Sequence, residues 1–444
     1  MERTTPALTR TSRLVAAGMI AALAIGLGAT TVDAAKARTK LVSVKSNGKQ
    51  GKDNSSNGFV SANGRFIAFS SVAENLVKND TNGRRDVFVH DRKTKKTTRV
   101  SVKSNGKQVN GDSDDPSISA NGRYVAFVSA ATNITKNAGS PTEDIFVHDR
   151  KTKKTRRVNY GTQPGAMPVI VQPSHSPEIS GNGRYVVWAS AQANFIADDE
   201  NDTTDVFIHD RKLKKTRLIS KASNGKQGSS LSKHPSISHD GRFVAFESHA
   251  DDLVVGDDNG DEDVFVRDRK KGRTKRVSVS SAGLQGSGES DDPAISGNGR
   301  FIAFETKATI ANGDGDAVAD VVIHDRKKKT TKLLSKNSSG QKGNMASGDA
   351  TISFDGRLVA FESNATNLVG TDLNVTQDIY VHDRKKKKTR RANVPKGGGE
   401  PSIGASQPRI SADGRFVTFQ TNDPSLVGND TNGLVDVFRR GPLH

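Results

Sequence analysis

The chain of 444 residues contains no cysteine. This absence excludes disulfide bonds, thiolate metal ligands, a cysteine nucleophile and a lipid-modified N-terminal cysteine. Aromatic residues make up 5% of the chain and apolar residues 33%, which is little for one thick α/β core. An array of repeats needs fewer apolar residues, because each unit buries its faces against its neighbours. The composition therefore favours a repeat architecture.

Common catalytic motifs are also missing, since the chain has no G-x-S-x-G, no H-E-x-x-H and no phosphate-binding loop. Acidic residues are in the minority, with 49 Asp and Glu against 67 Lys and Arg, which gives a formal net charge of +18. An excess of this size favours anionic partners or serves solubility alone.

Residues 1–37 are predicted to be a secretory signal peptide. Three arginines precede an apolar run from Leu14 to Leu27, and small-residue cleavage patterns end at Ala34 and Ala37. The run is short for a membrane span, although an uncleaved anchor is the alternative. No later apolar run is long enough to cross a bilayer. We therefore expect a secreted, periplasmic or cell-envelope protein whose residues 38–444 form one domain.

Two signatures recur seven times along residues 38–444. The first is [ND]-G-R, whose glycines are Gly64, Gly122, Gly183, Gly241, Gly299, Gly356 and Gly414. The second is an aspartate that opens a run such as DVFVHDR, at Asp86, Asp144, Asp205, Asp263, Asp320, Asp378 and Asp436. Successive members of the second series are about 58 residues apart. A fixed period of this length indicates repeated structural units.

Each repeat is predicted to contain four short strands. In the segment 115–158 they are residues 116–119, 123–129, 144–148 and 155–158, with an Asn-Gly hairpin turn between the first two. Residues 40–44 resemble a spare fourth strand, and the last repeat ends after its third strand at 436–438. Pairing these two segments would close a ring and remove an open sheet edge. We therefore predict an all-β fold: a seven-bladed β-propeller of four-stranded antiparallel blades.

The pattern S-x-[ND]-G-R, then an apolar strand, then D-[VI]-[FY]-V-x-D resembles the WD40-like PD40 repeats of TolB-type propellers. The resemblance covers essentially all of residues 38–444. It implies the propeller fold and leaves the function open, because such propellers serve both as interaction platforms and as parts of enzymes.

The hairpins between the predicted third and fourth strands are strongly basic. Six of them carry 34 of the 67 Lys and Arg residues. A ring of this kind can bind a polyanion, or it can be a solvated face that prevents edge aggregation. An anionic cell-envelope polymer is favoured over nucleic acid, because no aromatic residues stand between the lysines. The candidate polyanion-binding residues are Lys95, Lys96, Lys153, Lys154, Lys214, Lys215, Lys270, Lys271, Lys327, Lys328, Lys386 and Lys387.

The opposite face is predicted to be acidic, since the loop before each third strand often reads D-x-[ND]-x-x-x-D. Oxygen ligands at this spacing suit Ca²⁺, while capping of their own turns by Asp and Asn is the alternative. The candidate metal ligands are Asp80, Asn82, Asp86, Asp199, Asn201, Asp205, Asp257, Asn259, Asp263, Asp314, Asp316, Asp320, Asp372, Asn374, Asp378, Asp430, Asn432 and Asp436. The second repeat has only Glu143 and Asp144 at this place.

The mouth of the central channel is the natural pocket of a propeller. The predicted channel lining is Phe59, Ser117, Glu178, Ser236, Ala294, Thr351 and Arg409, and the neighbouring mouth offers Asp115, His234, Asp292 and Asp349. Repeated His-Asp pairs such as His90-Asp91 are interpreted as structural, because an active site is normally assembled once. The sequence thus predicts a monomeric, non-enzymatic binding or scaffold propeller for a protein or an anionic polymer. A lyase or hydrolase acting at the channel mouth is the alternative.

Overall fold

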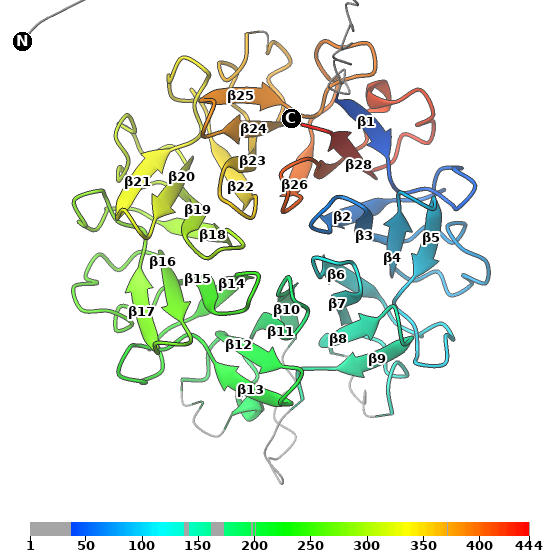
Figure 1. Cartoon of the computed structure of the whole chain (residues 1–444), viewed down its shortest axis with the longest axis horizontal. Coiled ribbons are helices and arrows are strands. Elements are labelled where there is room, and N and C mark those ends of the chain that lie inside the picture. The colour runs from blue at the N-terminus through cyan, green and yellow to red at the C-terminus, as the bar shows by residue number, and fades with distance from the viewer. Residues whose placement is uncertain are drawn as a thin grey trace, which may run out of the picture. The chain divides into compact units, whose positions relative to one another are not determined.

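The computed structural model describes residues 37–136, 142–160, 173–196, 199, 201–370 and 372–443. These residues form a seven-bladed β-propeller, as predicted, and each blade is a four-stranded antiparallel sheet (Figure 1). The predicted signal peptide, apart from Ala37, lies outside the described residues. Within the described part of the chain, no helix is long and apolar enough to cross a membrane.

Blades 1 to 6 each use four consecutive strands, ordered from the channel outward. Blade 1 contains β2 (Ser55–Val60), β3 (Phe66–Ser71), β4 (Asp86–Asp91) and β5 (Lys96–Arg99). Blade 2 contains β6 (Ser113–Ile118), β7 (Tyr124–Ser129), β8 (Asp144–Asp149) and β9 (Lys154–Arg157). Blade 3 contains β10 (Ser174–Ile179), β11 (Tyr185–Ser190), β12 (Asp205–Asp210) and β13 (Lys215–Leu218).

Blades 4 to 6 repeat this arrangement. Blade 4 contains β14 (Ser232–Ile237), β15 (Phe243–Ser248), β16 (Asp263–Asp268) and β17 (Arg273–Arg276). Blade 5 contains β18 (Ser290–Ile295), β19 (Phe301–Thr306), β20 (Asp320–Asp325) and β21 (Thr330–Leu333). Blade 6 contains β22 (Ser347–Ile352), β23 (Leu358–Ser363), β24 (Asp378–Asp383) and β25 (Lys388–Arg391).

Blade 7 joins the two ends of the described chain. It contains β26 (Ser406–Ile410), β27 (Val417–Thr421), β28 (Asp436–Gly441) and, as its outer strand, β1 (Arg38–Leu41). Arg38 pairs with Gly441 and Leu41 with Phe438 in an antiparallel register. The predicted closure is confirmed, although the strand begins two residues before the predicted position. The pairing register with β28 determines that start, and Val42 still donates its N–H to the carbonyl of Val437.

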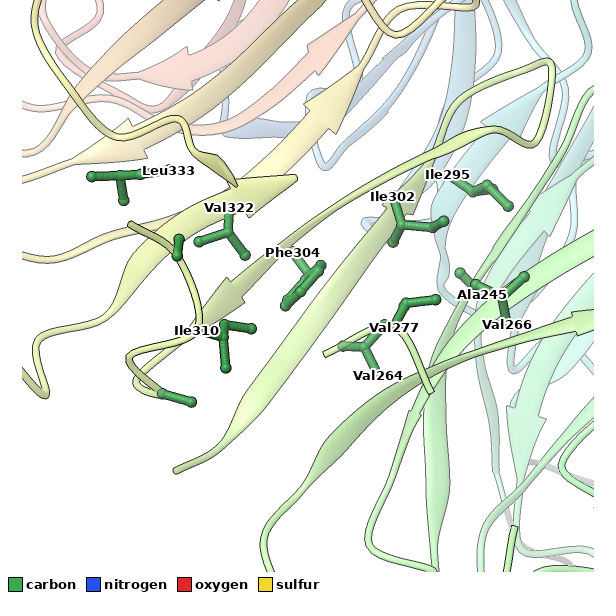
Figure 2. Close-up of a cluster of buried hydrophobic side chains, with 12 residues drawn as sticks. Ala245, Val264, Val266, Val277, Ile295, Ile302, Phe304, Ile310, Val322 and Leu333 are labelled. Carbon is green, nitrogen blue, oxygen red and sulfur yellow. The ribbon is translucent and has the colours of Figure 1, made fainter. Parts of the chain in front are cut away.

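The core lies between the blades. The third strands of blades 1 to 6 are buried at every residue, because a neighbouring blade covers each face. Figure 2 shows one such layer, in which Val264 and Val266 of blade 4 lie near Ile302, Phe304 and Val322 of blade 5. Because both faces of these strands are packed against a neighbouring blade, their apolar residues follow one another and do not alternate with polar residues.

The [ND]-G-R signature joins neighbouring blades. Gly122 adopts a φ of +71°, and a Cβ atom there would lie 2.1 Å from Cδ2 of Phe66 in the preceding blade. The Arg150 guanidinium lies 4.4 Å from the centre of that ring and donates to the carbonyl of Gly122. Arg123 forms a two-pronged ion pair with Asp149, at 2.8 and 2.7 Å. The motif therefore builds the contact between blades as well as the turn.

Each inner strand carries a bulge where the ladder to the second strand shifts register, at the third position in blades 1 to 6 and at the second position in β26. The residue at this position has a positive φ in every blade, although none is glycine. These residues are Asn57, Asp115, Ser176, His234, Asp292, Asp349 and Gln407. Left-handed backbone at non-glycine residues is costly, so its repetition marks this ring as a place where side-chain direction matters.

Candidate functional site

The lysine hairpins, meaning the six turns between the third and fourth strands of blades 1 to 6, lie on one face of the ring. All twelve predicted polyanion-binding lysines, from Lys95 to Lys387, are exposed. Four of them adopt a left-handed φ at the tip of the turn: Lys95, Lys153, Lys214 and Lys387. Among the described residues, no ion pair involves any of the twelve.

The arginines of these hairpins are used differently from the lysines. The first arginine, such as Arg92, stacks on an aromatic ring of the neighbouring blade. The last, such as Arg99, lies at the far end of the fourth strand, where its Nη1 is 2.9 Å from Asp86 Oδ2. The positive charge that faces solvent on the lysine hairpins therefore comes mainly from lysine. Some of the arginines counted with these hairpins instead pair with carboxylates on the opposite, acidic face.

The predicted metal-ligand sets all lie where the sequence places them, in the loop before each third strand. The middle residue of each set caps its own turn, as Asn82 Oδ1 does by accepting from the N–H of Arg84 at 3.2 Å. The side-chain amide of Asn82 donates to the carbonyl of Val109 in the blade-to-blade crossover. The turn-capping interpretation is thus realised at these residues.

The two aspartates of each set share a donor. Arg99 lies between Asp80 and Asp86 in blade 1, at 3.0 and 2.9 Å, and Arg276 and Arg391 take the same place in blades 4 and 6. In blade 5 the Lys342 ammonium group lies 3.3 Å from Asp314 and 2.8 Å from Asp320, and it also contacts Asp316. A tethered cation therefore occupies four of the predicted sets.

Blades 3 and 7 differ, because leucine replaces the arginine at the end of the fourth strand, as it also does in blade 5, and glutamine stands where blade 5 has Lys342. There a neutral glutamine amide bridges the carboxylates: Gln227 lies 2.8 Å from Asp199 and 2.6 Å from Asp205. Gln50 lies 2.7 Å from Asp430 and 2.6 Å from Asp436. Burial raises the pKa of Asp205 and of Asp436 to about 6.

The repeated His-Asp pairs have structural partners. His90 Nδ1 lies 2.9 Å from the hydroxyl of Thr97, which donates to the carbonyl of Val44 in the preceding crossover. Burial lowers the pKa of His90 to about 4. Asp91 accepts from the N–H of Lys93 at 3.0 Å and pairs with Arg65. Asp91 therefore caps the hairpin turn, in agreement with the structural interpretation of the His-Asp pairs, whereas its arginine partner was not predicted.

The channel mouth forms a cavity of about 280 Å³, lined by the inner strands of all seven blades. All four predicted mouth residues line it, and so do the predicted channel residues except Ser117. The hydroxyl of Ser117 instead accepts from the N–H of Ile179 in the next blade, at 3.0 Å. Arg409 Nη1 pairs with Asp349 Oδ1 at 2.9 Å.

Blades 4 and 5 bring together the most unusual group. His234 Nδ1 lies 2.9 Å from Glu247 Oε1 and 2.9 Å from Asp292 Oδ1. Lys233 Nζ lies 2.7 Å from the same Glu247 oxygen, and Glu247 is fully buried. Hydrogen bonds to Asp292 and Glu247 raise the pKa of His234 to about 10, so this imidazole is cationic at neutral pH.

Glutamates on the second strands were missed by the sequence interpretation. Glu247, Glu305 and Glu362 occupy the same position in three consecutive repeats, where other repeats have Ser70, Val128, Ala189 and Gln420. Burial raises the pKa of Glu305 to about 8 and that of Glu362 to about 7. In the sequence these glutamates stand at the variable position x of the second-strand pattern [VI]-A-F-x-[ST], which is the signal that could have revealed them.

One carboxylate group in this sector has the spacing of a cation site. Asp291, Asp292 and Glu305 carry oxygens that lie within 4.8 Å of one another. Burial raises the pKa of Asp291 to about 7, with the neighbouring carboxylates adding to the effect. Carboxyl groups of this sector can therefore be protonated near neutral pH, because closely spaced like charges disfavour the ionised form.

Comparisons with known proteins identify a fold. No family model and no curated protein matches the chain. An oligogalacturonate lyase in complex with manganese superposes with a TM-score of 0.52 at 11% identity, covering 91% of this chain and 90% of its own. The β-propeller domain of the Trilobed protease from Pyrococcus furiosus, described as having an open velcro topology, superposes with a TM-score of 0.50 at 12% identity, covering 87% and 94%.

TolB-like propellers are also among the structural neighbours. TolB from Acinetobacter baumannii superposes with a TM-score of 0.40 at 14% identity, covering 76% of this chain and 62% of its own. Identities this low show a shared propeller architecture and nothing about activity. The lyase and the protease domain likewise show only the fold of this chain, so its function has to be argued from its own site residues.

Proposed function

We propose that this chain is an exported, non-enzymatic binding propeller that holds an anionic cell-envelope polymer across its lysine hairpins. The observation that carries the proposal is the set of twelve exposed lysines with no ion-pair partner among the described residues. Acidic groups on this face, such as Asp91 and Asp149, are already paired with Arg65 and Arg123. The uncompensated lysine charge is therefore available to an external anion.

The polymer is proposed to bind by charge and without sequence readout. Lysine presents a mobile, hydrated ammonium group, which suits a repeating sulfate, phosphate or carboxylate better than one planar ligand. Binding of this kind releases counterions, so affinity falls steeply as salt rises. A solvated face with no ligand would show no such dependence.

Retention on immobilised dextran sulfate over a salt gradient tests the proposal. Replacing Lys386 and Lys387 by glutamine should lower the affinity about fivefold for each lysine, as for lysines that face an anionic surface. The matched control replaces Lys49 and Lys107, which are exposed in the crossovers between blades and lie outside the lysine hairpins, by glutamine. Equal losses in the two variants would show that net charge alone governs retention, and would contradict the proposal.

Calcium binding by the aspartate loops remains part of the proposal in a narrower form. A calcium ion in blades 1, 4, 5 or 6 would have to displace an arginine or lysine, whereas in blades 3 and 7 it would displace only a glutamine amide. Blades 3 and 7 are therefore the proposed Ca²⁺ sites. Carboxylate and carbonyl oxygens at these loops are ligands of the type that Ca²⁺ takes.

A lyase or hydrolase at the channel mouth is a second candidate, favoured by the contact of cationic His234 with Glu247 and Asp292. Contact with His234 lowers the pKa of Asp292, while burial raises the pKa of the neighbouring Asp291 to about 7. The sector can thus hold a general base and a general acid close together. This candidate predicts cleavage of an acidic polysaccharide, measured as new reducing ends, that is lost in His234→Gln. Activity that survives this substitution would refute it.

A further inference from the structure

The crossovers between blades normally cover the outer seam of the ring. In five of them a serine hydroxyl accepts from the N–H of a threonine on the next fourth strand, at 3.0 to 3.2 Å. The pairs are Ser46–Thr97, Ser104–Thr155, Ser223–Thr274, Ser281–Thr331 and Ser338–Thr389. The same five crossovers form a short antiparallel bridge, such as Val44 with Gln50.

The crossover from blade 6 to blade 7 is built differently. Lys396 stands where the others have the serine, and its N–H donates to the carbonyl of Ser425, away from Thr39 of β1. Three glycines follow at 397–399 in place of the Asn-Gly turn. The threonine itself is retained, since the Thr39 hydroxyl donates to the carbonyl of Val394 at 2.9 Å. The threonine contact between blades 6 and 7 is therefore kept, but the crossover does not cover the seam between these two blades.

The seam between β25 and β1 holds a cavity of about 870 Å³, which we call the seam cavity. Figure 1 shows β25 and β1 as the outer strands of the neighbouring blades 6 and 7. This volume falls in the range of sites that hold small molecules, about 300–1,000 Å³. Its apolar lining comes from the core cluster shared by blades 6 and 7. The apolar lining residues are Leu358, Val381, Ala392, Leu426, Val427 and Leu443.

The polar lining of the seam cavity is almost entirely cationic. It comprises Arg38, Lys40, Lys388, Arg390, Arg391, Lys396 and Arg440, against the single acidic residue Asp383. Asp383 is already held by Arg357, at 3.1 and 2.7 Å. Arg38, Lys40, Lys388 and Lys396 are exposed around the cavity. Arg391 is paired with Asp378, whereas these four exposed cations take part in no ion pair among the described residues. An apolar floor beside such positive charge selects for a ligand with both properties.

We propose that the seam cavity binds an amphipathic anion, namely a carboxylate or phosphate carried on an apolar chain. The apolar body would cover the partly exposed Leu443 and the small exposed parts of Val381 and Val427, while the head group would meet Lys40 and Lys396. A neutral apolar ligand would leave the cations without a partner, and a cationic ligand would be repelled. The site is separate from the proposed polymer surface, although Lys388 and Arg390 adjoin both.

Calorimetric titration of the full chain with octyl phosphate, octanoate, octanol and octylammonium, each below its micelle concentration, tests the proposal. The two anions should bind, octanol should bind at least about tenfold more weakly because charge-assisted hydrogen bonds are lost, and octylammonium should not bind. A difference between octyl phosphate and octanoate identifies the preferred head group. Equal binding of octanol or octylammonium would overturn the proposal.

Two variants locate the ligand. Gly397→Phe places a ring in the cavity, since Gly397 has open space around it and no left-handed φ, and it should abolish binding. Gly315→Phe is the matched control, because Gly315 has the same freedom in blade 5. Melting temperatures of both variants should match that of the parent. Binding that survives Gly397→Phe would overturn the proposal.

A charge pair separates this site from the lysine hairpins. Lys40→Gln with Lys396→Gln should weaken octyl phosphate about tenfold, as expected for losing hydrogen bonds to a charged group, whereas Lys327→Gln with Lys328→Gln should not. Equal effects would place the ligand on the hairpins and refute the seam site. Retention of Gly397→Phe on dextran sulfate should remain unchanged, so failure of one proposal does not imply failure of the other.

Discussion

Replacing Gly122 by alanine tests the contact that joins the blades. The new residue would have to keep a φ of +71°, which costs an L-residue about 1–2 kcal/mol. Its Cβ would also lie 2.1 Å from Cδ2 of Phe66, and overpacking of this kind costs about 1–3 kcal/mol. The substitution should therefore lower the free energy of unfolding by about 2–5 kcal/mol.

Gly106→Ala is the matched control. Gly106 has a φ of +81°, but a Cβ atom there would meet nothing within 4 Å. It should therefore show only the backbone cost, about 1–2 kcal/mol. Urea titrations followed by circular dichroism measure both values, and an unchanged slope shows that the same surface unfolds.

Removal of the ring completes the cycle. In a Phe66→Ala background the excess cost of Gly122→Ala over Gly106→Ala should vanish, because the atom it clashes with is gone. Two results would refute the reasoning. One is an equal cost at the two glycines in the parent protein, and the other is an excess that persists without the Phe66 ring.

Three further measurements follow from the structure. Proton NMR titration should find the five repeat histidines neutral down to about pH 4, because burial lowers each pKa; they are His90, His148, His209, His324 and His382. His234→Gln should lower the stability by its full amount below about pH 6.5 and by progressively less toward pH 10, because the native pKa of His234 is raised to about 10. Thermal melts at several pH values measure this, and an effect that is independent of pH would contradict it. Millimolar Ca²⁺ should raise the melting temperature of chelator-treated protein, and Asp205→Asn with Asp436→Asn should remove the increase, whereas Asp86→Asn should not; no increase in the parent would reject the calcium sites.

The sequence predicts the architecture well because the repeat carries it. The period, the turn at Asn121-Gly122 and the spare strand at one end are local or countable features, and the structure confirms the blades and their closure. The strand limits are off by one to three residues in the segment 115–158, since β6 begins at Ser113 and β9 at Lys154. Hydrogen bonding to the adjacent strands sets those limits, and one strand read alone does not contain that information.

The sites are predicted less completely, because they are built from contacts between repeats. The mouth residues Asp115 and His234 follow from knowing which strand is innermost. The contact of His234 with Glu247 depends on the bulge and on the second strand, and it was not predicted. The aspartate loops were recognised as oxygen-rich, but their arginine and glutamine partners, such as Arg99, come from other elements. A count of charged residues along the sequence therefore overstates how many of those charges are unpaired in the folded protein.

The closure of blade 7 also bears on the order of folding during synthesis. Leu41 pairs with Phe438, so the first strand of the described domain remains unpaired until β28 has been made. Closing a loop of this length costs about 5 kcal/mol of chain entropy. Blades 1 to 6 can form one after another as they emerge, whereas blade 7 assembles only once β28 has been made. A chain that ends before blade 7 would expose the apolar face of blade 6 and an unpaired first strand, both of which proteases and chaperones can recognise.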